Sequence, residues 1–174
     1  FFFKQKTAYE ILTCDWSSDV CSSDLLVRKV IERAGSALPT TLDGQPFRQA
    51  IMAPTRLYVK SVLAALQAHP IKALAHITGG GLTENIPRVL PDHCAAHLQR
   101  SHWPRTELFT WLQTIAGIDE AEMCRTFNNG IGMVLVVAPE HAQACTETLT
   151  AHGEQVHAIG TIASRGQGAA VVMD

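Results

Sequence analysis

Two patterns of hydrophobic and polar residues recur along the chain, and each predicts a different kind of element. Apolar residues spaced three or four positions apart are typical of a helix with one buried face, whereas short apolar runs are typical of strands. Together with the glycine and proline residues at segment ends, the first pattern predicts helices at 26–34, 46–52, 58–68, 82–89, 106–116, 119–126 and 139–151. The second pattern predicts strands at 71–77, 94–98, 131–138, 155–163 and 169–173.

The order of these elements predicts an α/β (α+β) fold, in which a mixed β-sheet is covered by helices. Three details of the pattern give more specific predictions. Strand 131–138 has no polar alternation, so we expect it to be buried on both faces. Pro87 within segment 82–89 indicates a short or kinked helix. Helix 58–68 is expected to bury one stripe, formed by Val59, Val62, Leu63 and Leu66.

The first 25 residues do not share these patterns. Turn-forming residues crowd the segment 16–24, where a helix or strand would need apolar repeats. The string DWSSDVCSSDL, at 15–25, is similar to the translation of a common sequencing-library adapter. We therefore expect residues 1–25 to be non-native sequence, with a genuine disordered tail as the alternative. Residues 26–174 are expected to form the native domain.

Composition and charge place the chain among single globular domains. Its 174 residues are 47% hydrophobic and 17% charged, which is typical of a folded protein rather than a disordered one. A net charge of −2 does not favour a nucleic-acid partner, and the apolar runs are shorter than the ~20 residues of a membrane helix. The five cysteines have no CxxC spacing, which favours a reducing, cytoplasmic location.

The segment HITGGGLTENIPR, residues 76–88, is the most informative stretch for function. A predicted strand ends at Thr78, three glycines follow, and a predicted helix begins after them. Such a turn gathers backbone N–H groups and can bind an anion, while Asn85 and Arg88 could add side-chain contacts. The alternative is an ordinary tight connection between a strand and a helix. The string matches neither a Walker loop nor the dinucleotide-binding fingerprint.

Other polar residues near the predicted strand ends are weaker candidates. His76 lies where open α/β sheets place ligands, although a hydrogen-bonded core histidine is the alternative. The turn Asn128-Asn129-Gly130 precedes a predicted strand, and Gly132 would permit the close approach of a backbone or a ligand. An ordinary helix-to-strand turn is the alternative there. No metal site is expected, because no tight zinc motif is formed by His93, Cys94, His97 and His102.

Longer strings are more specific than spacing alone. LVRKVIERAG, APTRLYVKSVL, HITGGGLTENIPR, FTWLQTIAGI and TFNNGIGM occur in one order and at natural separations. From residue 26 to about residue 170, the chain closely resembles the carboxy-terminal domain of the aminoimidazole ribonucleotide synthetase family. It departs from the family at Asn129, where Met or Cys is usual, and in the histidine-rich run at 93–102.

The resemblance implies an enzyme of purine biosynthesis that uses ATP and Mg²⁺ to close the imidazole ring of formylglycinamidine ribonucleotide. The formyl oxygen would be activated by phosphoryl transfer, which asks the protein mainly for positioning and charge stabilisation. By resemblance, His76, Asn85 and Asn128 would border the substrate site, and Arg88 would either join them or tie its helix to a neighbouring loop. A phosphate or phosphoryl group would face Thr78, Gly79, Gly80 and Gly81. The resemblance assigns no catalytic base.

The same resemblance implies that an amino-terminal ATP-binding domain is absent. In the family that domain supplies most of the nucleotide and metal site and the homodimer interface. We therefore expect this chain to be an inactive fragment with exposed apolar surface. One alternative is a related ATP-dependent synthetase that shares the domain. Another is a non-catalytic ligand-binding or regulatory module of the same fold.

Overall fold

The computed structural model describes residues 22–174. Residues 1–21, most of the segment expected to be non-native, lie outside the described residues. The first described element is helix α2 (Ser22–Ala34), which begins before the predicted start at residue 26. Gly35 follows it with a left-handed φ of +53°, so the helix ends where the glycine predicted.

One half of the sheet structure is a strand pair that carries both glycine-containing turns. Strand β3 (Ile71–His76) pairs antiparallel with β5 (Met133–Val137), and His76 lies opposite Met133. The pairing continues one step further, because the Ile77 amide donates to the Gly132 carbonyl at 2.9 Å. The segment that follows β3 therefore begins beside the segment that leads into β5.

The other half is a three-stranded sheet. Strand β4 (Cys94–Leu98) lies between the antiparallel β6 (Gly160–Ser164) and the parallel β7 (Val171–Met173). The mixed character of the sheet structure agrees with the predicted fold class, although the strands form separate sheets. The remaining strands are a short hairpin of β1 (Thr41–Leu42) and β2 (Gln45–Pro46).

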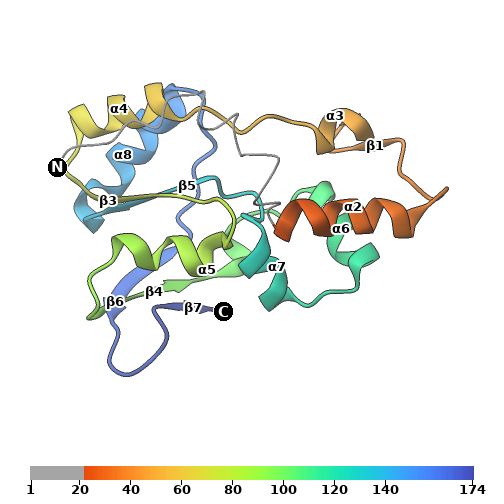
Figure 1. Cartoon of the computed structure of the whole chain (residues 1–174). Helices are drawn as coiled ribbons and strands as arrows, with labels where there is room; N and C mark the ends of the chain where they lie inside the picture. Colours follow the sequence, from red (N-terminus) through yellow and green to blue (C-terminus); the bar gives the residue numbers. More distant parts are fainter. Residues whose placement is uncertain (1–21) are drawn as a thin grey trace, which may run out of the picture.

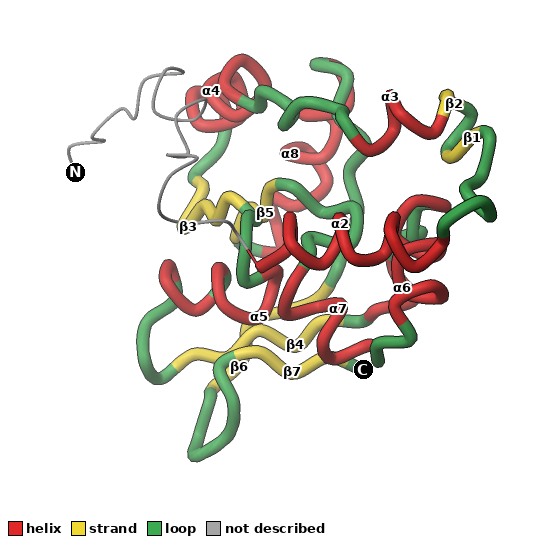
Figure 2. The backbone as a smooth tube through the Cα atoms, turned by 45° about the vertical axis from the view of Figure 1, so that its right-hand side comes forward, coloured by secondary structure: helices red, strands yellow, loops and turns green. Residues whose placement is uncertain are grey.

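Helices lie on both sides of the β3–β5 pair. Further α-helices in the described part are α3 (Phe47–Ile51), α4 (Val59–Ala68), α5 (Gly81–Asn85), α6 (Glu107–Ala116), α7 (Glu120–Thr126) and α8 (Pro139–Ala151), with 3-10 turns η1 (Pro87–Val89) and η2 (Arg100–His102). Figures 1 and 2 show α4 and α8 on one side of the β3–β5 pair. They show α5 on the other side, between that pair and the sheet of β4, β6 and β7.

Three apolar clusters hold these layers together. The largest joins β3, α5 and β4, and contains Ala75, Ile77, Leu82, Ile86, Ala96, Leu98, Trp103 and Ile131. A second joins α2, α6 and α7 through Val30, Leu112, Met123 and Phe127. The third joins α4 and α8 to the β3–β5 pair through Ala65, Cys145 and Leu149. The glycine turn after β3 is thus anchored at the edge of the largest cluster.

The predicted buried stripe of helix 58–68 is wrong. Val59 is 63% exposed, Leu63 is 52% exposed and Leu66 is 38% exposed. The buried residues of α4 are Ser61 and Ala65, the latter fully inaccessible, because small side chains let α4 pack closely against α8. Of the four residues predicted to form the buried stripe, Val62 is half-buried and the other three are exposed.

Two strand predictions also need correction. The residues of β5 are half-buried rather than buried on both faces, since β5 pairs only with β3. The predicted strand 155–163 begins only at Gly160, because β4 offers pairing partners from Gly160 onward. Helix 82–89 is short, as Pro87 indicated: α5 ends at Asn85 and the 3-10 turn η1 follows.

Candidate functional site

The glycine turn connects the end of β3 to α5. Thr78 and Gly79 are exposed, whereas the flanking Ile77 is 2% exposed and fixes the turn to the core. The Gly81 amide donates to the Thr78 carbonyl at 3.0 Å, which closes the turn, and α5 starts there. The predicted order of strand, glycine turn and helix is therefore present in the fold.

The three positions of the turn differ in why glycine occupies them. Gly80 and Gly81 have left-handed φ values of +93° and +56°, which favour glycine. A Cβ on Gly81 would lie 1.9 Å from the Cys124 carbonyl oxygen, so this glycine lets α5 approach the end of α7. A Cβ on Gly79 would meet no atom within 4 Å. Gly79 is thus the residue of the turn that borders open space.

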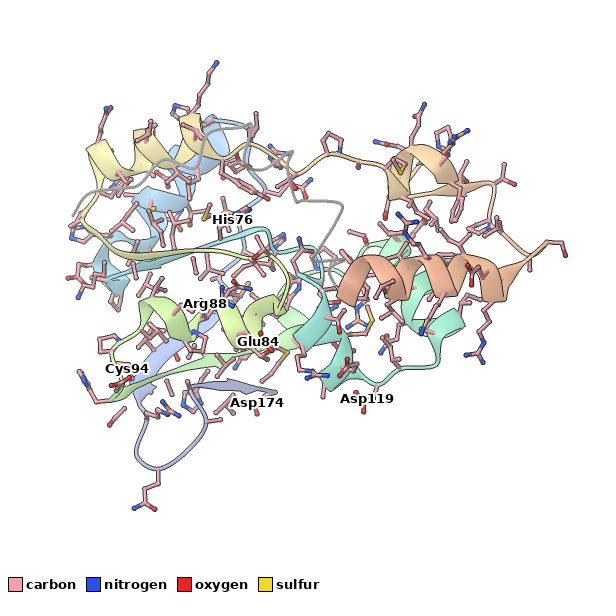
Figure 3. The ribbon with its side chains drawn as sticks, viewed as in Figure 1. His76, Glu84, Arg88, Cys94, Asp119 and Asp174 are labelled. Atoms are coloured by element: carbon pink, nitrogen blue, oxygen red, sulfur yellow. The ribbon has the colours of Figure 1, made fainter. Side chains whose placement is uncertain are left out.

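The backbone N–H groups of Gly79 and Gly80 have no hydrogen-bond partner among residues 22–174. They are therefore free to bind an anion. The Glu84 side chain, on α5, lies back over Gly80: a Cβ there would be 2.6 Å from the Glu84 Oε2 atom. Figure 3 shows Glu84 on this helix. An anionic ligand would have to move this flexible carboxylate aside, because like charges repel.

Asn85 lies beneath the turn and holds its shape. This side chain is only 4% exposed. Its amide nitrogen donates to the carbonyls of Gly81 at 2.8 Å and Gly79 at 3.1 Å, and the Thr78 hydroxyl donates to its oxygen at 3.5 Å. These bonds hold the carbonyls of the turn toward Asn85 and fix its backbone.

Arg88 lies beyond the end of α5, in η1 (Figure 3). It does not share a continuous α-helix with Asn85, because α5 ends at Asn85. The guanidinium is exposed and has no hydrogen-bond or ion-pair partner within residues 22–174. The described part of the chain therefore offers no contact that ties Arg88 to a neighbouring loop.

The second turn lies before β5. The Gly130 amide donates to the Asn128 Oδ1 atom at 3.1 Å, and the Ile131 amide donates to the Asn128 carbonyl at 3.0 Å. Asn129 has a φ of +49° and is fully buried. The Trp103 indole N–H donates to its carbonyl at 3.2 Å, so this turn is locked into the largest core cluster.

His76 is exposed at the end of β3, and its ring meets an aromatic residue that the sequence analysis did not single out. The rings of His76 and Tyr58 contact edge to face, with centroids 6.2 Å apart. Tyr58 precedes α4 and is half-buried. Burial, and then the negative charge of Glu154, raise the pKa of the Tyr58 phenol. No local signal could have linked residues 58 and 76, because only the packing of α4 on β3 brings them together.

A network of charged residues lies beside α7, and its Cys124 contacts both turns, through the carbonyl oxygen at Gly81 and the sulfur at Asn129. Hydrogen bonds from the Arg105 guanidinium, together with nearby charge, lower the pKa of Glu120 to about 2. Burial, and then the Glu120 charge, raise the pKa of the Cys124 thiol to about 11. The three cysteines in the described part, Cys94, Cys124 and Cys145, are free thiols. This network supports the α7 region and makes no contact with the Gly79 and Gly80 amides.

The histidine-rich run does not assemble a metal site. His97 lies on β4, and the His102 Nδ1 atom bonds with the Ala158 carbonyl at 2.8 Å. Among the described residues, no group of three His, Cys, Asp or Glu side chains could hold a metal ion. None of the helices within residues 22–174 is both long and apolar enough to cross a membrane.

Comparisons with known proteins give one consistent result. Residues 11–173 match the family described as AIR synthase related protein, C-terminal domain. A phosphoribosylformylglycinamidine cyclo-ligase from Polaromonas sp. strain JS666 is 70% identical over 148 residues, which is 85% of this chain and 43% of the relative. Similar proteins of the same name come from Albidiferax ferrireducens, 69% identical over 85% of this chain and 42% of the relative, and from Bordetella pertussis, 53% identical over 83% of this chain and 42% of the relative. The chain thus spans less than half the length of these relatives.

Proposed function

Because the chain belongs to the family of AIR synthase related proteins as a carboxy-terminal domain, we propose that it is the carboxy-terminal part of an ATP-dependent ring-closing ligase. Its substrate in this proposal is formylglycinamidine ribonucleotide, and its product is aminoimidazole ribonucleotide. The names of its relatives support this choice. We assign the reaction to the complete protein, since the chain spans about 43% of the first relative.

One structural observation carries the proposal: both specific motifs meet at the same end of the β3–β5 pair. The glycine turn follows His76, and the Asn128 turn leads into Met133, the residue opposite His76. Gly81 also packs against the carboxyl end of α7, at the Cys124 and Phe127 carbonyls, so the glycine turn lies next to the segment that leads into the Asn128 turn. Free backbone N–H groups and an exposed imidazole therefore gather at one edge of the domain.

The residues present fit an anionic phosphate group. The Gly79 and Gly80 amides can donate to phosphate oxygens, and the open space above Gly79 leaves room for them. ATP would supply the phosphoryl group that converts the formyl oxygen into a leaving group. In this proposal the amides hold negative charge in place, Asn85 maintains the turn, and His76, Asn128 and Arg88 border the substrate.

We assign the other parts of the site to the portion of the relatives that this chain does not cover. That portion would bind most of the nucleotide and Mg²⁺ and would form the homodimer interface. We assign no magnesium ligand to residues 22–174, where no suitable cluster of side chains occurs. A small-molecule substrate and a place in purine biosynthesis favour a cytoplasmic enzyme with neither a nucleic-acid nor a membrane partner.

A chimera tests the proposal. Residues 26–174 are joined to the amino-terminal part of the Polaromonas relative to give a completed enzyme, and ring closure is measured with and without that part. We expect turnover by the completed enzyme and none by the chain alone. Turnover by the chain alone would contradict the division of the site. Ligand binding by the completed enzyme without turnover would favour a non-catalytic module instead.

Substitution of Gly79 makes the test specific to the turn. Gly79→Val shields the amides without backbone strain, because Gly79 has no left-handed φ and no neighbour at its Cβ position. We expect a loss of about 100-fold or more in kcat/KM, the size seen when one preorganised donor is removed. Gly168→Val is the matched control, since its Cβ position has only an ordinary contact, with the Arg165 carbonyl oxygen at 3.5 Å. Equal activity in both variants would contradict the proposal.

A further inference from the structure

Tyr58 touches the candidate site from the side of α4. Its ring lies edge to face with the His76 imidazole, at 6.2 Å between centroids and an interplanar angle of 66°. Its hydroxyl lies directly over the backbone of Gly132: a Cβ on Gly132 would be 1.9 Å from the Tyr58 Oη atom and 2.8 Å from Cζ. Gly132 must therefore lack a side chain for Tyr58 to occupy this position.

These two contacts fall on both strands of the pair that carries the site. His76 is the last residue of β3, and Gly132 directly precedes β5. The two strands meet here through the hydrogen bond from the Ile77 amide to the Gly132 carbonyl. A single aromatic side chain thus packs across the strand ends from which the glycine turn and the Asn128 turn extend.

Tyr58 is itself held firmly. Its carbonyl accepts a hydrogen bond from the Ser61 hydroxyl at 3.0 Å, and the Ser61 hydroxyl also contacts the Glu154 carboxylate at 2.7 Å. The same carboxylate pairs with Arg56 at 2.8 Å, and Arg56 donates to the Gly153 carbonyl at 2.7 Å. These bonds fasten the start of α4 to the chain just after α8, so the backbone that carries the phenol ring is held in place.

We propose that Tyr58 is a positioning residue, whose ring holds the His76 imidazole at the open edge of the β3–β5 pair beside the glycine turn. This inference rests on the proposed function, because it requires His76 to face the substrate. Tyr58 acts through His76 and the Gly132 backbone rather than by touching the substrate. The aromatic ring positions the His76 imidazole, and the hydroxyl group is not needed for this.

The test compares variants of the completed enzyme. Tyr58→Leu removes the ring, Tyr58→Phe keeps it, and Gly132→Ala displaces it by placing a Cβ at the hydroxyl position. Phe47→Leu is the matched control, since it removes a similar edge-to-face contact, with Trp111, far from the site. Three quantities are measured: the imidazole proton signals of His76 in NMR spectra, assigned with His76→Gln, and the kinetic constants kcat and KM.

We expect the His76 signals to lose their ring-current shift in Tyr58→Leu and Gly132→Ala and to keep it in Tyr58→Phe. The first two variants should lose about tenfold or more in kcat with a smaller change in KM, because a small misplacement of a positioned group slows the reaction. Tyr58→Phe and Phe47→Leu should stay within about twofold of the parent.

The proposal is overturned by unchanged His76 signals or unchanged kcat in Tyr58→Leu, or by a loss of activity in Tyr58→Phe as large as in Tyr58→Leu. If Tyr58→Leu does not fold, a nuclear Overhauser contact between the two rings in the parent enzyme decides whether the rings meet, and Gly132→Ala supplies the kinetics. Gly79→Val separates the two failures. Its loss of activity beside a fully active Tyr58→Leu rejects only the positioning role, whereas full activity in both rejects the phosphate-binding role of the glycine turn as well. Absence of turnover by the unsubstituted completed enzyme rejects the proposed function itself.

Discussion

Asn129 combines a left-handed backbone with complete burial, and asparagine is one of the few residues that tolerate that backbone. Its amide nitrogen contacts the Cys124 sulfur at 3.5 Å, whereas its Oδ1 atom is buried without a partner within the described residues. The neighbouring Asn128 is half-buried, and its Oδ1 atom accepts from the Gly130 amide. A negative charge should therefore be tolerated at position 128 and strongly disfavoured at position 129.

We expect Asn129→Asp to lower the free energy of unfolding at pH 7 by about 2–4 kcal/mol, because a buried, unpaired carboxylate is strongly disfavoured. Asn128→Asp should cost about 1 kcal/mol or less, since the introduced carboxylate still accepts from Gly130. Burial raises the pKa of the introduced carboxyl at 129, so its penalty should shrink as pH falls toward about 4, where the unfolded carboxyl also binds a proton. Urea unfolding at pH 7 and pH 4 measures this, and equal losses at both positions would contradict it.

The glycine turn shows how far single residues can be predicted. The string HITGGGLTENIPR predicts a strand, a turn and a short helix, because each depends on neighbouring residues. It treats the three glycines as equivalent, yet only Gly79 borders open space, while Gly81 is required by the carbonyls of α7. The role of Asn85 beneath the turn and the contact between Tyr58 and His76 likewise depend on distant packing. Such relations are invisible to local patterns.

At the scale of elements, helices with local end signals were predicted well. Thr106 caps α6 and Asp119 caps α7 through bonds to backbone amides, and Gly117 ends α6 with a φ of +68°. The face that a helix buries is harder to predict. In α4 most of the apolar stripe is exposed, whereas the small residues Ser61 and Ala65 are buried, and Ala65 packs against Cys145 and Leu149 of α8.

This inversion gives a stability prediction for α4. Ala65→Leu should lower the free energy of unfolding by about 1–3 kcal/mol, because the extra atoms must enter the packed contact with α8. Leu63→Lys should change it by no more than about 0.5 kcal/mol, because Leu63 is 52% exposed. Chemical denaturation of the two variants provides the comparison. A larger loss of unfolding free energy in Leu63→Lys than in Ala65→Leu would contradict this, and would mean that the face predicted from the helical period is the buried one.

At the scale of the whole molecule, the predicted family is confirmed by the match over residues 11–173 and by close relatives. The α/β fold class is confirmed as well. Apolar side chains are exposed on and before α4, at Leu57, Val59 and Leu63, and that an absent domain leaves them uncovered stays a prediction. The non-native origin of residues 1–25 and the binding roles of the site residues stay predictions.

A structure of the completed enzyme with formylglycinamidine ribonucleotide and a non-hydrolysable ATP analogue would show whether the Gly79 and Gly80 amides hold a phosphate group. The quantity is the distance from these amide nitrogens to the nearest phosphate oxygen. We expect about 2.7–3.2 Å, the range of a hydrogen bond, with the Glu84 carboxylate moved off Gly80. Phosphates bound elsewhere, with only water at the turn and Glu84 in its present place, would show that these amides do not bind phosphate.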